Sequence, residues 1–152
     1  MSQSPPKFTA EHVVAYDYKR SVGPVLGRFF TALRDRRLLG SRAPGGRVLC
    51  PPMEHDPETG DALGEDALTE VGPGGVVTSW AWVSRPRERH PLKQPFAFAL
   101  IRPDGATGCL VHAVDAGSEA QMRTGMRVRP RWRAARTGAI GDIECFEPEA
   151  RT

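Results

Sequence analysis

The first patterned stretch of the chain is helical and lies between residues 22 and 37. Apolar residues recur there at a spacing of three to four, which places them on one face of a helix: Val25, Leu26, Phe29, Phe30 and Leu33. Ser21 is positioned to cap this helix, and Pro24 suits its first turn. Arg34, Arg36 and Arg37 fall in its last turns, where cations interact favourably with the helix dipole.

The next stretch predicts a small ribbon rather than a second helix. It contains two short strands separated by turns, with strands at 38–39 and 47–49 and turns at 43–46 and 56–60. Pro51 and Pro52 interrupt the pairing after the second strand. Residues 61–75 then read as an acidic, Gly-rich connection. This ribbon has few apolar residues with which to form a core of its own.

From residue 76 onward the pattern is that of β-structure. Five apolar or alternating runs predict strands, at residues 76–83, 96–101, 109–114, 126–134 and 140–146. A short helical turn at 118–123, capped by Ser118 and closed by Gly125, lies between the third run and the fourth. Five strands with a helical insert at this point have the layout of an OB-fold barrel. We therefore predict a mainly β chain in which a helix and a ribbon precede a five-stranded OB-fold barrel.

This pattern divides the chain into four parts. We expect an extension and helix at 1–37, a ribbon with its linker at 38–74, the barrel at 75–148 and a tail at 149–152. The chain has 152 residues, of which 39% are hydrophobic, and this is enough to bury a substantial core. No run approaches the roughly 18 apolar residues of a membrane span, and the first residues do not resemble a secretory signal. We therefore expect a cytoplasmic protein that does not cross a membrane.

Cysteine content and charge narrow the possible functions further. Cys50, Cys109 and Cys145 are odd in number and far apart, so neither a disulfide framework nor a CxxC zinc motif is present. The net charge is +3, and 18 of the 21 cationic residues are arginine, which suits bidentate contacts with phosphate or carboxylate. Because 18 acidic residues nearly balance these cations, the charge does not require a general polyanion binder.

Several segments together resemble a known family. The matching pieces are the helix at 25–33 with Arg37-Leu38-Leu39-Gly40, the ribbon at 47–52, and barrel segments at 75–80, 95–101, 122–128 and 145–148. In order and spacing they are similar to the acyl-CoA-associated zinc-ribbon/OB-fold proteins, a family long known as a domain of unknown function. The resemblance covers roughly residues 22–148 and implies a rubredoxin-like ribbon followed by an OB-fold barrel.

The ribbon departs from this family at its metal ligands. Members carry two CxxC pairs, one on each side of the Pro-Pro, whereas here Ala43 and Gly45 stand at the first pair and Asp56 and Thr59 at the second. A structural zinc site needs four ligands in tetrahedral array, mostly thiolates or imidazoles. Cys50, His55 and Asp56 lie nearby without the required spacing. We therefore expect a degenerate ribbon without zinc, ordered by hydrogen bonds and by packing, including packing against a partner.

The resemblance also implies an accessory role. Proteins of this type act beside, or are fused to, thiolase-fold enzymes and hydratases that process CoA thioesters. The arginine-rich form without zinc ligands resembles the actinobacterial partner of a thiolase-like aldolase in steroid (cholesterol) side-chain degradation. By this resemblance the chain is a non-catalytic part of a lyase complex. The retro-aldol chemistry on the acyl-CoA belongs to the partner, with a hydratase fused or docked nearby and no cofactor of the chain's own.

Two groups of residues are candidates for binding. Arg127, Arg129, Arg131 and Arg133 alternate with other residues, so a strand would place the four guanidinium groups on one face. That face is either simply solvated, or attracts the nucleotide-diphosphate end of CoA, or meets an acidic partner surface. The second group is a large apolar load outside the barrel, and we expect part of it to dock on the partner: Tyr16, Tyr18, Phe29, Phe30 and Leu33.

The remaining features favour structure over chemistry. His112 lies in an apolar run without a recognisable nucleophile motif beside it, so we interpret it as a structural residue and predict no catalytic residue in this chain. His90 lies in the arginine-rich segment 85–90, which is either a solvated loop or a contact for a phosphate or a partner's acid. Single-strand nucleic-acid binding is the alternative function for an OB-fold, with the tryptophans as stacking surfaces. These lie in apolar runs that favour core packing: Trp80, Trp82 and Trp132.

Overall fold

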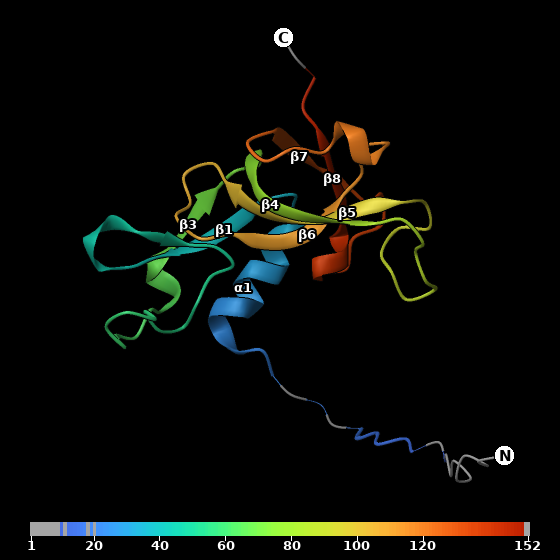
Figure 1. Ribbon diagram of the computed structural model, residues 1–152. Coiled ribbons are helices and arrows are strands. Elements are labelled where there is room, and N and C mark those ends of the chain that lie inside the picture. Colours follow the sequence, from blue (N-terminus) through green and yellow to red (C-terminus); the bar gives the residue numbers. More distant parts are fainter. Residues whose placement is uncertain (1–9, 11, 18, 20, 151–152) are drawn as a thin grey trace, which may run out of the picture.

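A computed structural model describes residues 10, 12–17, 19 and 21–150 of the chain. It shows one α-helix, a small three-stranded sheet and a closed five-stranded barrel in that order along the described residues (Figure 1). The predicted fold class, a mainly β chain with a five-stranded OB-type barrel after an N-terminal helix, is therefore confirmed. No helix in the described part of the chain has the length and apolar character needed to cross a membrane.

The helix α1 (Gly23–Arg34) forms where the apolar spacing predicts it. Its N-cap is Val22, and Pro24 occupies the first turn as expected. Ser21 lies one residue earlier and accepts a hydrogen bond from the Gly23 N–H at 3.3 Å. Val25, Phe29, Ala32 and Leu33 form the buried face, and this face packs toward the ribbon and the barrel.

The ribbon contains one more strand than expected. The strands β1 (Leu38–Arg42) and β2 (Val48–Leu49) pair antiparallel, as predicted. A third strand, β3 (Leu68–Val71), pairs with the other edge of β1 and gives the sheet order β2-β1-β3. The interpretation of residues 61–75 as a plain connection is therefore wrong. Its four residues carry too short a pattern to predict a strand, and the strand exists because β1 supplies its hydrogen-bond partners.

The barrel closes in the order β4-β5-β6-β8-β7. Its strands are β4 (Gly75–Val83), β5 (Phe96–Pro103), β6 (Leu110–Val114), β7 (Arg127–Trp132) and β8 (Ile143–Pro148). Neighbouring strands pair antiparallel except β6 and β8, which are parallel at Val114 and Phe146, and β7 closes the barrel against β4. The helical insert between β6 and β7 is a single 3-10 turn, Glu119–Gln121, and Ser118 makes no side-chain cap there.

The last two strands are shorter than their sequence pattern predicts. β7 ends at Trp132 rather than near Ala134, and β8 begins at Ile143 because Ile140–Asp142 forms a 3-10 turn. The buried Asp142 carboxylate explains why the segment between β7 and β8 is not extended. It accepts hydrogen bonds from the backbone N–H groups of Thr137, Gly138 and Ala139 at 2.8–3.2 Å. Those amides are thereby satisfied by a side chain and not by a strand ladder.

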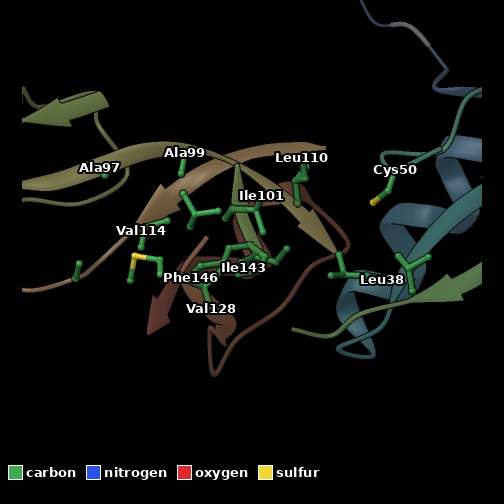
Figure 2. Packing of buried hydrophobic residues seen from close by; sticks show 14 of the residues in the cluster. Leu38, Cys50, Ala97, Ala99, Ile101, Leu110, Val114, Val128, Ile143 and Phe146 are labelled. Carbon is green, nitrogen blue, oxygen red and sulfur yellow. The ribbon is translucent and has the colours of Figure 1, made fainter. Parts of the chain in front are cut away.

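One hydrophobic core runs continuously from the ribbon into the barrel. Leu38 and Cys50 of the ribbon belong to the same buried cluster as Ile101, Val128 and Phe146 of the barrel. Figure 2 shows the two ribbon residues at one end of this cluster and the barrel residues at the other. Because both parts share this core, we expect the ribbon and the barrel to unfold together.

Candidate functional site

The positions expected to hold zinc do not provide a metal site. Ala43 is a buried apolar residue, Gly45 lies in a tight turn with φ +80°, and Thr59 is exposed on a loop. The nearby Cys50 is buried, and this burial raises the pKa of its thiol to about 12, far from the thiolate that binds zinc. In the described part of the chain, no three His, Cys, Asp or Glu residues are grouped so that they could hold a metal ion. The residues present do not fit the zinc that the family's fold implies.

An ion pair joins the two turns that a zinc ion would otherwise connect. The Arg47 guanidinium, beside the first turn, donates to both oxygens of the Asp56 carboxylate at 2.8 and 3.0 Å and also contacts Glu58. Asp56 is buried and accepts a further hydrogen bond from the Glu58 N–H. That backbone hydrogen bond, together with the hydrogen bond and charge of Arg47, lowers the pKa of Asp56. Asp56, which stands where the second CxxC pair of the family begins, is thus a carboxylate that pairs with Arg47.

A buried hydroxyl and a small apolar cluster complete the ribbon. The Ser41 Oγ donates to the Met53 carbonyl at 2.9 Å and accepts from the Met53 N–H at 3.0 Å, so it links β1 to the segment after Pro51 and Pro52. Ser41 itself is fully buried. Ala43, Leu49 and Leu63 pack together as a separate cluster. Hydrogen bonds and packing within the chain therefore connect the parts of the ribbon to one another.

The arginines of β7 are neutralised by carboxylates of the chain itself. Arg127 pairs with Asp104 and Glu149, Arg129 with Glu147, and Arg131 with Asp115, Glu144 and Glu147. These hydrogen bonds raise the pKa of Arg127, and Arg133, just beyond the strand, donates to the Gly141 carbonyl. A CoA phosphate or an acidic partner would have to displace these intramolecular carboxylates. This makes the β7 arginines weak candidates for either contact.

The expected apolar interface is only partly at the surface. Phe29 and Leu33 are buried in the core of the chain, so the prediction that they contact a partner is wrong. The reason is that α1 covers the barrel and ribbon with this face. Phe30 is half-buried and lines a groove of about 520 Å³ between α1 and the turn before β8, together with Val22 and Ile140. Tyr16 is 81% exposed, and Tyr18 lies outside the described residues.

The histidine and tryptophan side chains have structural surroundings. His112 packs edge-on against Phe146 with ring centroids 5.6 Å apart, and burial lowers its pKa. Its Nδ1 is shielded from solvent and has no hydrogen-bond partner in the described part of the chain. Trp80, Trp82 and Trp132 are half-buried and pack against the main core. They are therefore poorly placed to stack on nucleic-acid bases.

A surface that sequence reasoning missed lies on the outside of the barrel. Phe98 and Leu100 point outward from β5 while Ala97, Ala99 and Ile101 point inward, and Val111 projects beside Leu100 from β6. With Ala81 on β4, these residues surround a shallow depression of about 200 Å³. We call Ala81, Phe98, Leu100 and Val111 the barrel-face surface. In a strand, Phe98 and Leu100 must point to the opposite face from Ala97, Ala99 and Ile101, and this alternation could have predicted the surface. Because all the residues of 96–101 are apolar, the sequence instead suggests that the whole run is buried.

A known protein family matches the part of the chain that contains most of the barrel. Residues 68–133 match the family model described as the C-terminal OB-fold domain of ChsH2. This match confirms the resemblance inferred from the sequence for the barrel part of the chain. A search of curated proteins gave no match.

Two solved structures share the fold over most of the chain. One is named "Ltp2-ChsH2(DUF35) aldolase" and superposes with a TM-score of 0.60 at 23% identity, covering 86% of this chain and 98% of the other. The second is a protein of unknown function from the DUF35 family of Sulfolobus solfataricus, with a TM-score of 0.58 at 22% identity, covering 72% and 77%. At these identities the two structures establish the fold.

Proposed function

We propose that this chain is a non-catalytic accessory subunit of an acyl-CoA-processing aldolase. The observation that carries the proposal is the match of residues 68–133 to the ChsH2 C-terminal OB-fold domain. The fold shared with a chain of the Ltp2-ChsH2(DUF35) aldolase supports it over the ribbon as well, since 86% of this chain is covered. By this proposal the partner is a thiolase-like subunit that performs retro-aldol cleavage of a steroid CoA thioester.

The surroundings of the candidate catalytic groups agree with a supporting role. His112 is half-buried with its Nδ1 shielded from solvent, the Cys50 thiol has a raised pKa, and the β7 arginines are engaged by carboxylates. Retro-aldol cleavage needs a base to take the proton of the β-hydroxyl group and a group to stabilise the enolate that forms. In the described residues these groups do not come together as a base beside an enolate-stabilising donor, and we assign both roles to the partner subunit.

Co-expression of the chain with a thiolase-like aldolase subunit tests the proposal. We expect the two to co-purify and the pair to release a short acyl-CoA from a steroid β-hydroxyacyl-CoA, with that activity lost when this chain is omitted. The isolated chain is the matched control and should turn over none of the thioester. A thiolase-like subunit that is stable and fully active alone would overturn the proposal, as would turnover by the isolated chain.

A further inference from the structure

The barrel-face surface exposes apolar side chains on an otherwise polar barrel. Val111 is 61% exposed, Leu100 is 40% exposed and Phe98 is 36% exposed, and the three are neighbours on β5 and β6. Leu100 pairs across the strands with Val111, and Phe98 pairs with Ala81 on β4. Large apolar side chains that are scattered singly need no explanation, but a contiguous group on one sheet face indicates an interaction surface.

A basic loop is fixed beside this surface. Residues 84–95 join β4 to β5 and contain four cations and a single carboxylate: Arg85, Arg87, Arg89 and Lys93 against Glu88. Leu92 anchors the loop in a buried cluster with Phe96. His90 packs edge-on against Phe96 and Phe98, with ring centroids 5.8 and 6.1 Å apart, and its Nδ1 accepts a hydrogen bond from the Arg87 N–H. The backbone of the loop at Arg87 is therefore held beside His90, which packs on Phe98.

The positive charge of this loop is not neutralised within the chain. None of its four cations forms an ion pair in the described residues, in contrast to the arginines of β7. Lys93 donates only to the Glu88 carbonyl. The loop carries a net charge of +3, equal to the net charge of the whole chain, so the remaining charges balance. The loop thus places four cations, which form no ion pair in the described residues, at one border of the barrel-face surface.

The chemistry of this surface distinguishes among its possible occupants. The depression of about 200 Å³ is smaller than the roughly 300–1,000 Å³ of small-molecule sites, which argues against the nucleotide end of CoA. Single-stranded nucleic acid binds by stacking on aromatic faces, but the two aromatic residues that line the depression are already packed within the chain: Phe96 and His90 pack against Phe98, and Trp80 packs against the main core. Aliphatic side chains with a cationic border instead match a protein surface that has an apolar centre and acidic residues along one side.

We infer that the barrel-face surface and the adjoining basic loop dock the aldolase partner, through an apolar patch of that partner bordered by carboxylates. This inference rests on the proposed function, and it assigns the contact to the barrel rather than to α1. The apolar centre supplies the desolvated contact, and the loop cations orient the partner and accelerate encounter.

The experiment measures the affinity between this chain and the thiolase-like subunit with which it co-purifies, using one variant in each part of the surface. Leu100→Glu places a charge in the apolar centre and should raise Kd at least about 100-fold. The double variant Arg87→Glu/Arg89→Glu should raise Kd about 10-fold at low ionic strength, with most of that difference lost at 0.5 M salt. All these side chains are exposed, so both variants should keep the far-ultraviolet circular dichroism of the parent.

Matched controls separate this contact from the alternatives. Arg123→Glu makes one such charge reversal at an exposed arginine outside the loop, and Ile140→Glu makes the apolar-to-acid change in the groove beside α1. Both should bind like the parent. Loss of binding in Ile140→Glu with retention in Leu100→Glu would move the contact to the α1 groove and overturn the inference, while the proposed function stood. Failure of the unmodified chain to bind would overturn both. A salt-sensitive shift of a single-stranded oligonucleotide that Arg87→Glu/Arg89→Glu abolishes would also overturn the inference.

Discussion

Replacing Ser41 by alanine isolates the hydrogen bonds that hold the ribbon. The Ser41 hydroxyl is fully buried and makes two hydrogen bonds to the backbone of Met53, at 2.9 and 3.0 Å. Alanine has nearly the same volume, so the substitution removes these bonds without creating a cavity of consequence. The segment after Pro51 and Pro52 then loses its connection to β1, a connection that cysteine ligation of zinc provides in a ribbon of the usual kind.

The expected cost follows from the two bonds. A hydrogen bond contributes about 1 kcal/mol net to stability, so Ser41→Ala should lower the free energy of unfolding by about 2 kcal/mol. For a chain of this size, 1 kcal/mol corresponds to a change in Tm of about 2–4 °C, so the melting temperature should fall by about 6 °C. Because ribbon and barrel share one core, this loss should appear in the main unfolding transition.

Urea denaturation of the parent and the variant measures this difference. Ser79→Ala is the matched control, because Ser79 is an exposed serine on β4, and it should change stability by no more than about 0.5 kcal/mol. The slope of the transition should be the same in all three proteins, since the surface exposed on unfolding does not change. Equal stability of Ser41→Ala and the parent would refute the conclusion that this hydroxyl stabilises the ribbon.

Three further predictions concern the ribbon and the helix that covers it. Because the pKa of Asp56 is lowered in the folded chain, its carboxylate stabilises the fold fully above the ordinary aspartate pKa of about 4, and this stabilisation is lost as the pH falls through the lowered value. Arg47→Met removes the ion pair with Asp56, so urea midpoints measured from pH 2.5 to 7 should depend less on acid in this variant than in the parent. Leu33→Ala removes a fully buried side chain of α1 and should cost about 2–5 kcal/mol by the same denaturation assay; a loss below 1 kcal/mol would contradict the packing of α1 on the barrel. Elemental analysis should find far less than one zinc per chain, and excess chelator should leave the Tm unchanged, whereas near-stoichiometric zinc would refute the ligand assignment at Ala43, Gly45, Asp56 and Thr59.

Local spacing was enough to predict those parts of the protein whose structure depends on near neighbours. The stripe at Val25, Phe29 and Leu33 predicts α1, because a helix is stabilised by contacts three and four residues apart and by one buried face. Apolar runs separated by turn residues predict all five barrel strands, although their ends differ by up to three residues. The replacement of the zinc-binding cysteines can likewise be recognised from the sequence, because it depends only on which residue type stands at each position.

The features that bear on binding depend on residues far apart in the chain. Alternation places Arg127 and Arg129 on one face, but Asp104, Glu147 and Glu149 come opposite them only when β7 closes against β4 and β8. The partnership of Arg47 with Asp56 likewise follows from the return of the chain after β2.

The strand β3 and the barrel-face surface share this origin. Leu68–Val71 becomes a strand by pairing with β1, and an apolar run such as 96–101 has no inside or outside until the barrel closes. Closure buries Ala97, Ala99 and Ile101 and leaves Phe98 and Leu100 exposed. The physical reason is the same in each case: strand pairing and burial are set by contacts between distant segments, and these have no counterpart in the local spacing of residues.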